Sequence, residues 1–483
     1  MGARAPEPTP ALRAPAPGSA TLSSIDRGFA VLLGGQILAR LLSFVVTVHL
    51  TRALLAEGFG AIAFATSVVL YAALIVDIGF DTLGPLEVAR RRIPPLRLVG
   101  AVVTLRLTMT LAAFAALVLF AWLAPLSTAT RTVVLLYGLS LVANALDLNW
   151  FFLGSGLMRP AAFAEILTQG LQAAGAFLLI NEPAHLVRMP LVFLASRLVT
   201  VVWLGARFVR RIGRFGLGFD VPLLRELLPV ALPCAGSAAV GALMHNFDLV
   251  IVGLWLGNEP AGLYGAAYRV VWIPTLVATA YYTALRPALA RASVEGFAGV
   301  QPLLGRSNRL SASIGIGISV GGILVAEPLI LFLFGPAYRQ ATRPLQILLG
   351  SFGLVAVSRL YRVLLVSFGH QALDLRIMGV GAALNVVLNL LLIGPAGLPG
   401  AAFATLASEA TLLVLYLSAT RRRVGRVPFA RELVKPAVCS VLMGVVLIAA
   451  RPLPILPAIG LGAAVYLLSL LAWGVIRLRE LGA

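Results

Sequence analysis

Charged side chains inside long apolar runs are the residues of this sequence that are best suited to chemistry. Six arginines sit in such runs: Arg40, Arg106, Arg197, Arg269, Arg359 and Arg362. A guanidinium group stays charged in any surroundings and binds phosphate oxygens through two parallel hydrogen bonds. The acids at comparable depth are fewer, namely Glu165, Asp248, Glu327 and Glu409. This surplus of positive charge predicts an interior site for an anion that carries phosphate groups.

The six arginines do not all suit that site equally. We expect Arg40 and Arg269 to contact the anion because both lie deep in their apolar runs, although ion pairs between helices would also explain them. Arg359 and Arg362 are three residues apart and share one helix face. They suit the arrival of an anionic head group, or alternatively they extend toward the membrane surface. Arg106 and Arg197 are expected to be structural.

The remaining polar residues of the apolar runs each have two interpretations. Asp248 is expected to pair with Arg269, and the alternative is that it binds a coupling ion, Na⁺ or H⁺. Glu409 is a second candidate for coupling. Asn385 and Asn389 are four residues apart on one helix face, so hydrogen bonds between helices explain them, and contact with a sugar is the alternative.

Further acids are expected near the ends of the apolar runs. These are Asp77 and Asp81, together with Asp147 and Glu165. They are expected either to pair with the basic run Arg90–Arg92 as a gate, or to be solvated charges in loops.

Other reactive groups are scarce. The four histidines, His49, His185, His245 and His370, lack the spacing of metal ligands. Cys234 and Cys439 lie in apolar stretches and are expected to be buried free thiols. The chain contains no phosphate-binding loop of the Gly-x₄-Gly-Lys type, and its only lysine is Lys435. We therefore expect no metal, no cofactor, no catalytic residue and no ATP hydrolysis.

The elements that position these residues are apolar helices. The 483 residues are 60% hydrophobic and 12% charged, with a mean hydropathy of +0.96. This composition excludes a soluble enzyme, a secreted disulfide-rich domain and a disordered chain. About fourteen runs are long enough to cross a bilayer. They lie near residues 28–50, 59–80, 98–124, 132–153, 161–180, 188–207, 227–256, 260–284, 309–334, 342–368, 375–394, 398–419, 434–450 and 454–476.

The net charge of +19 serves mainly to orient the chain. Most arginines fall in the segments that lie on one side when both termini are cytoplasmic, as the positive-inside rule requires. This placement excludes a nucleic-acid surface. Residues 1–26 are expected to be a disordered cytoplasmic tail.

Weak repeats divide the rest of the chain. Gly60 and Pro85 recur as Gly262 and Pro287, 202 residues later, and Gly156 recurs as Gly369 after 213 residues. We therefore predict an all-α polytopic fold with two six-helix lobes, 27–215 and 216–425, in parallel repeat around a central cavity. A C-terminal helix pair, 426–483, lies outside the repeat.

Several motifs resemble one family of membrane transporters. They are Leu50–Leu55 with Gly58-Phe59-Gly60, Asp77–Asp81, Gly262-Leu263-Tyr264 with Tyr268-Arg269, Leu333-Phe334-Gly335, Pro344-Leu345-Gln346, Asn385 with Asn389, and Ser408-Glu409. In this order they resemble the oligosaccharide flippases of the multidrug/oligosaccharidyl-lipid/polysaccharide exporter superfamily, and the chain is also similar to its lipid II flippases. In that family, cavity arginines occupy the positions of Arg40 and Arg269.

The resemblance implies a function and a location. It implies alternating-access transport of an undecaprenyl-pyrophosphate-linked glycan to the outer leaflet of the bacterial inner membrane, for cell-surface polysaccharide synthesis. The partners would be membrane lipid and, downstream, a polysaccharide polymerase and glycosyltransferases, with the protein itself a monomer. By position, the last two helices suit a groove for the lipid tail. A multidrug antiporter of the same superfamily and a membrane-embedded polymerase or glycosyltransferase remain as alternatives.

Overall fold

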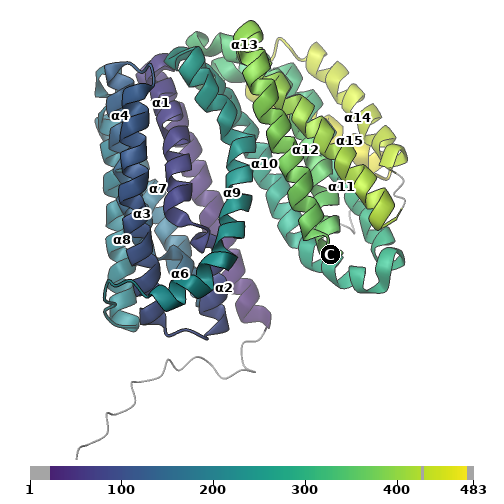
Figure 1. Ribbon diagram of the computed structural model, residues 1–483. Helices are drawn as coiled ribbons and strands as arrows, with labels where there is room; N and C mark the ends of the chain where they lie inside the picture. The colour runs from purple at the N-terminus through teal and green to yellow at the C-terminus, as the bar shows by residue number, and fades with distance from the viewer. Residues whose placement is uncertain (1–21, 426–428, 476–483) are drawn as a thin grey trace, which may run out of the picture.

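The computed structural model describes residues 22–425 and 429–475, and every regular element within them is a helix (Figure 1). In lipid a helix satisfies its own backbone hydrogen bonds, which is why apolar runs of this length fold in this way. The elements are α1 (Leu22–Asp77), α2 (Phe80–Arg90), α3 (Pro95–Leu123), α4 (Thr128–Gly138), α5 (Ser140–Leu146), α6 (Asn149–Gly154), α7 (Met158–Leu179), η1 (Pro183–His185), α8 (Arg188–Arg211), α9 (Val221–Trp255), α10 (Asn258–Ala292), η2 (Ser293–Glu295), α11 (Gly296–Phe334), η3 (Pro336–Ala341), α12 (Thr342–Ser367), α13 (Gln371–Arg423), α14 (Phe429–Ala449) and α15 (Ile455–Ala472).

The protein is a multi-pass membrane protein. Within the described residues, 11 helical stretches are long and apolar enough to cross a membrane. Three of them, Val31–Arg90, Asn258–Phe334 and Gln371–Arg423, contain 60, 77 and 53 residues. Each exceeds twice the roughly 20 residues that one crossing needs, so each is long enough for two crossings. The count of fourteen crossings stays a prediction.

The predicted repeat is confirmed by the backbone. Leu55 interrupts α1 with φ 59° and ψ −177°, and Gly257, 202 residues later, has φ 93° and ψ −173°. At the second offset of 213, Gly156 and Gly369 have φ values of 73° and 79°. These angles are rare for ordinary residues, so their recurrence at the same offsets marks equivalent positions of two copies.

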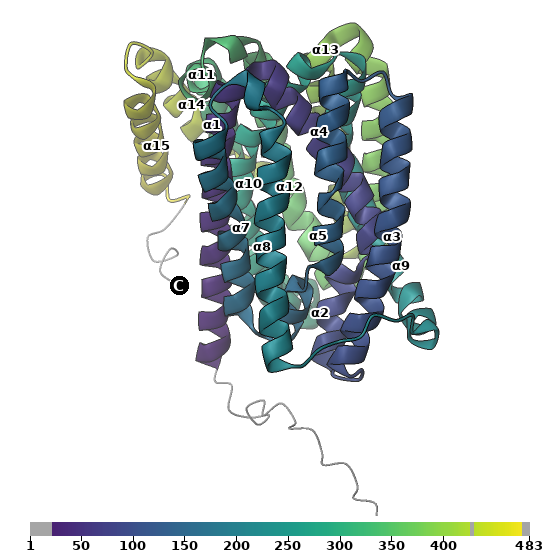
Figure 2. The same cartoon turned by 90° about the vertical axis from the view of Figure 1, so that its left-hand side faces the viewer.

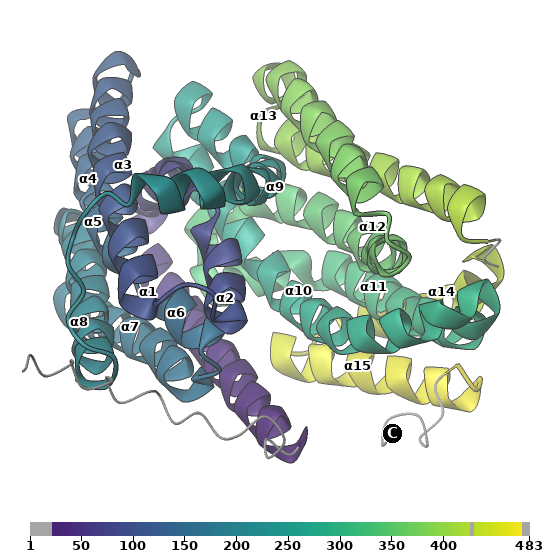
Figure 3. The same ribbon diagram turned by 60° about the horizontal axis from the view of Figure 1, so that its bottom comes forward.

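The copies form two groups of helices that diverge toward the end of the molecule where α1 begins (Figures 1 and 3). Helix α9 links them. Its first residues, including Leu223 and Leu227, pack in the apolar core of α3, α6 and α8, whereas Met244 packs in the core of α11–α13. The predicted lobe boundaries at 215/216 and 425/426 stay predictions. Of the predicted tail, residues 22–26 are helical and the rest lies outside the described residues.

The two groups meet at the opposite end. Arg52 of α1 donates hydrogen bonds to the carbonyl oxygens of Leu333 (2.9 Å) and Phe332 (2.5 Å) at the end of α11. The hydroxyl of Tyr338 donates to the carbonyl of Thr51 over 3.2 Å. The last carbonyls of a helix lack hydrogen-bond donors within the helix, so the guanidinium of Arg52 supplies donors to the end of α11.

Helices α14 and α15 stand at the periphery of the molecule (Figure 2). The hydroxyl of Tyr466 on α15 donates to the carbonyl of Ser313 on α11, over 2.7 Å. A Cβ atom on Gly317 would lie 2.3 Å from the Tyr466 ring, so glycine is what lets α15 approach α11.

Candidate functional site

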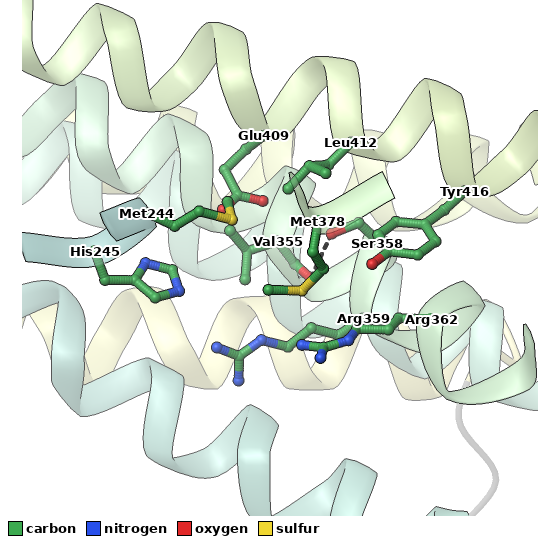
Figure 4. Close-up of a pocket in the computed structure, with 10 residues that line it drawn as sticks. All are labelled: Met244, His245, Val355, Ser358, Arg359, Arg362, Met378, Glu409, Leu412 and Tyr416. Atoms are coloured by element: carbon green, nitrogen blue, oxygen red, sulfur yellow. Dashed lines mark hydrogen bonds between the residues drawn. The ribbon is translucent and has the colours of Figure 1, made fainter. Parts of the chain in front are cut away.

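A polar pocket lies between α9, α12 and α13 in the C-terminal group of helices (Figure 4). It has an empty volume of about 380 Å³. Two of the predicted arginines line it, and so does the predicted acid Glu409. The lining residues are Met244, His245, Val355, Ser358, Arg359, Arg362, Met378, Glu409, Leu412 and Tyr416.

Both pocket arginines are held in place by hydrogen bonds to neighbouring side chains. Arg359 Nη1 donates to Thr279 Oγ1 of α10 over 2.9 Å. Arg362 Nε donates to both carboxylate oxygens of Asp374, over 3.0 and 3.2 Å, and Tyr416 donates its hydroxyl to the same carboxylate over 2.6 Å. The guanidinium groups lie side by side in Figure 4. Two adjacent guanidiniums that are fixed in this way suit a ligand with phosphate oxygens.

Sequence reasoning missed three residues that shape this pocket. Asp374 lies in the first turn of α13, just ahead of the apolar run that was expected to begin at residue 375. The three-residue spacing between Arg362 and Arg359 pointed to a shared face, but nothing in the sequence identified a partner for either of them. Neither His245 nor Tyr416 has a sequence signal, because only the packing of α9 against α13 and of α13 against α12 brings them to the arginines.

Arg40 lies in a second polar group, in the N-terminal half of the structure. Its side chain is exposed in the protein surface, and its charge acts on Glu165 of α7 together with that of Arg197. Arg197 donates to Asn144 Oδ1 and lies 3.9 Å from Asp147. Among the described residues, Arg40 makes no ion pair, whereas Arg197 has the structural contacts expected of it.

The expected pair between Asp248 and Arg269 is wrong. Asp248 is buried, and its carboxylate accepts a hydrogen bond from the Tyr264 hydroxyl over 2.8 Å. Arg269 lies on the same helix as Tyr264 but turns toward Tyr137 of α4, and its guanidinium carbon is 5.9 Å from the centre of the Trp272 ring. A phenol can satisfy a buried carboxylate without a second charge, which leaves Arg269 without an acidic partner in the described part of the chain.

The expected gate between the acids and Arg90–Arg92 is also not formed. Arg106 donates to Asp77 and, over 2.8 Å, to Asp81. Arg90 pairs with Glu87 of its own helix. The side chain of Arg106 is 2% exposed, so its charge requires these acids, and the structural role expected for Arg106 agrees with this.

Asn385 and Asn389 are both fully buried in α13 and bond to each other. Asn389 Nδ2 donates to the carbonyl oxygen and to Oδ1 of Asn385, each over 2.9 Å. The expected hydrogen bonds between helices are therefore absent among the described residues, and Asn389 Oδ1 is left without a partner there. Contact with a sugar stays a prediction.

The structure does not support the predicted excess of interior arginines over interior acids. The structure adds the acids Asp77, Asp81, Asp147 and Asp374 to the neighbourhood of the interior arginines. Three interior arginines nevertheless make no ion pair within the described residues, namely Arg40, Arg269 and Arg359. No group of three or more potential metal ligands is found in that part of the chain.

Comparisons with known proteins place the fold. The structure matches that of the lipid II flippase MurJ in an inward closed conformation, with a TM-score of 0.78 and 14% identity over 94% of this chain and 100% of that one. It also matches an inward-facing multidrug resistance MATE family transporter of the MOP superfamily, with a TM-score of 0.65 and 14% identity over 79% and 94% of the two chains. The chain therefore has the fold of this superfamily of transporters.

Sequence relatives are proteins of glycan synthesis. The chain is 24% identical over 267 residues to the probable low-salt glycan biosynthesis flippase Agl15 of Haloferax volcanii, which covers 54% of this chain and 55% of that one. It is 23% identical over 193 residues to the teichuronic acid biosynthesis protein TuaB of Bacillus subtilis, with 40% and 39% covered. The chain thus spans about half or less of the length of the curated relatives that it matches. The model of one family covers more than half of the chain, residues 25–293, and the chain belongs to that family, the polysaccharide biosynthesis proteins.

Proposed function

We propose that this protein is a flippase for lipid-linked oligosaccharide. It moves an undecaprenyl-pyrophosphate-linked glycan from the cytoplasmic to the outer leaflet of a bacterial inner membrane, for the synthesis of O-antigen, exopolysaccharide or capsule. Both termini lie on the cytoplasmic side, and the protein works as a monomer. A polymerase and glycosyltransferases act on the same lipid-linked glycan.

The observation that carries this proposal is the pair Arg359 and Arg362, two adjacent guanidiniums that line one pocket inside a membrane transporter fold. A pyrophosphate bears two charged groups next to each other, and bidentate guanidinium contacts match that geometry. We take Arg40 and Arg269 as further contacts along the route of the head group, because neither makes an ion pair within the described residues. Family membership and the flippase named among the relatives support the glycan as substrate.

Alternating access supplies the movement. The two groups of helices touch at the end that carries Arg52 and diverge at the other, as an inward-facing state requires (Figure 1). Asp248 is the candidate site for a coupling ion, Na⁺ or H⁺, since its buried carboxylate is neutralised by no cation in the described residues. Glu409 is the second coupling candidate, and Glu165 remains a candidate for a gating residue.

Transport of a fluorescent lipid-linked oligosaccharide in proteoliposomes tests the proposal. We expect the purified protein to move the lipid between leaflets, and Arg359→Gln with Arg362→Gln to slow this movement at least about tenfold, the factor for roughly 1.4 kcal/mol of lost binding. The matched control is Arg207→Gln, because Arg207 is an exposed arginine that lies over the Trp203 ring, 4.5 Å from its centre, outside the pocket.

The same vesicles distinguish the competing functions. Movement of organic cations without movement of glycolipid would identify a multidrug antiporter instead. Lengthening of the glycan would identify a polymerase. Glycolipid movement that is unchanged in the double arginine variant would refute the assignment of the site.

A further inference from the structure

Glu409 is a carboxylate that the pocket buries without a partner. Its side chain is 5% exposed, and within the described residues it makes no hydrogen bond and no ion pair. It enters the pocket from α13, across from the two guanidinium groups (Figure 4). A buried charge without a partner costs several kcal/mol, so this carboxylate is stable only when a cation faces it or when a proton neutralises it.

The cations that face Glu409 are the groups that would bind phosphate. The charges of Arg359 and Arg362 both act on Glu409. Arg362 uses Nε for Asp374, and within the described residues its Nη1 and Nη2 donate to no protein acceptor. The same N–H groups therefore stabilise either an anionic ligand or the carboxylate of Glu409. A second negative charge brought next to Glu409 would repel it.

We propose that Glu409 is a built-in competitor of the anionic head group, so that binding of a pyrophosphate to Arg359 and Arg362 is accompanied by uptake of one proton at Glu409. This inference rests on the proposed function, since it takes that head group as the ligand. Without the ligand, Glu409 faces the guanidiniums, whose charges favour its ionised form. When the pyrophosphate arrives, one carboxylate oxygen of Glu409 takes a proton from water. The proton returns to water when the ligand leaves, and no other bond changes.

The other charged and titratable groups around Glu409 come from four helices. They are His245 of α9, Tyr268 of α10, Arg359 and Arg362 of α12, and Tyr416 of α13 with Asp374 behind Arg362. Tyrosine and arginine keep their protons near neutral pH. Histidine is the other residue type here whose ordinary pKa lies in this range, and the charges of Arg359 and Arg362 act on His245 too, so it needs its own control.

Titration calorimetry on the full chain in detergent micelles tests the inference. The probe is dimethyl pyrophosphate, whose two charges do not titrate near neutral pH. Measuring the binding heat in buffers of different ionisation enthalpy counts the protons taken up for each probe that binds. Glu409→Gln keeps the size of the side chain and removes the charge. Glu327→Gln is the matched control, because Glu327 pairs with Arg339 outside the pocket, and His245→Gln removes the second titrating group.

We expect the wild-type protein, Glu327→Gln and His245→Gln to take up protons when the probe binds at neutral pH, with an upper limit of one proton for each probe. Glu409→Gln should take up none and bind roughly ten times more tightly at that pH, the factor for one removed charge–charge contact. Binding by the wild-type protein without proton uptake, or uptake that persists in Glu409→Gln, would overturn this inference and leave the flippase proposal standing. No binding of the probe by the wild-type protein would overturn it as well. The vesicle assay with lipid-linked oligosaccharide decides the flippase proposal separately.

Discussion

Gly60 of α1 and Gly262 of α10, which occupy equivalent positions of the two repeats, lie where these two helices, one from each half of the molecule, cross in close contact. A Cβ atom on Gly60 would lie 1.7 Å from the carbonyl oxygen of Asn258, and one on Gly262 would lie 1.9 Å from that of Ala56. Real side chains do not tolerate such distances. The two glycines therefore allow the backbones to touch, and the contact closes one end of the transporter.

Substitution of either glycine by alanine should force this end open. We expect Gly60→Ala to lower transport at least about tenfold, because the closed end must separate by more than 1 Å and misplacement on this scale disrupts function. Labelling of a reporter cysteine at Thr130, which accepts a hydrogen bond from Asn258 over 2.8 Å, should speed up in a protein without Cys234 and Cys439. Gly170→Ala is the control, since nothing lies within 4 Å of its Cβ position. Equal labelling in Gly60→Ala and wild type would contradict the assignment.

Leu55 occupies a backbone conformation that its repeat partner fills with Gly257. Because φ 59° with ψ −177° strains a residue that has a Cβ atom, we expect Leu55→Gly to raise the free energy of unfolding by about 1–3 kcal/mol. Thermal unfolding in micelles measures this change. Leu86→Gly is the matched control: the two leucines are 52% and 51% exposed, but Leu86 is helical and should lose about 1 kcal/mol. A decrease of stability in both variants would refute the strain.

Arg106 should matter for stability and not for substrate. Removing its charge in Arg106→Gln leaves Asp77 and Asp81 without a cation, which should cost about 3–5 kcal/mol. The triple variant with Asp77→Asn and Asp81→Asn should recover part of that loss. Arg359→Gln, in the open pocket, should change unfolding by no more than about 1 kcal/mol. Equal losses of stability in the two single arginine variants would contradict the distinction between them.

Contacts of Asp220 hold the segment that connects the two halves of the molecule at the point where this segment meets α9. Hydrogen bonds from Arg97 and from the backbone N–H of Leu223 hold the pKa of this carboxyl below its ordinary value of 3.8. The contact therefore stabilises the fold above that value and is lost as the pH falls through the lowered pKa. Hydrogen exchange of residues 213–224 should speed up in Asp220→Asn at neutral pH and in wild type only below the ordinary value of 3.8, after correction for the intrinsic rate. Faster exchange in wild type already at pH 5 would refute this assignment.

Tyr416 and Asp374 should act through Arg362. Tyr416→Phe removes one hydrogen bond to Asp374, a loss of about 1 kcal/mol, and should weaken binding of dimethyl pyrophosphate several-fold. Asp374→Asn should weaken it further, because Arg362 loses its ion pair. In a protein that already carries Arg362→Gln, Tyr416→Phe should have no additional effect on binding. An effect of the same size in both backgrounds would show that Tyr416 does not act through Arg362.

The sequence alone was sufficient to predict the membrane fold, because lipid allows an apolar chain only a few backbone structures. Long apolar runs must become helices to satisfy their backbone, and glycines at fixed offsets indicated a repeat that the angles of Leu55 and Gly257 confirm. The structural roles of Arg106 and Arg197 were also predictable, since a buried guanidinium needs acids nearby.

Tertiary structure alone decided the partners. Asp77 and Asp81 meet Arg106 and not the basic run Arg90–Arg92, and Asp248 meets a tyrosine and not Arg269. Helical spacing fixes which residues share a face, but it does not fix how neighbouring helices are rotated and shifted against each other. That packing brings Asp374 next to Arg362 and places Glu409 across from Arg362. The pocket is therefore created by the packing of the helices and not by the number of arginines.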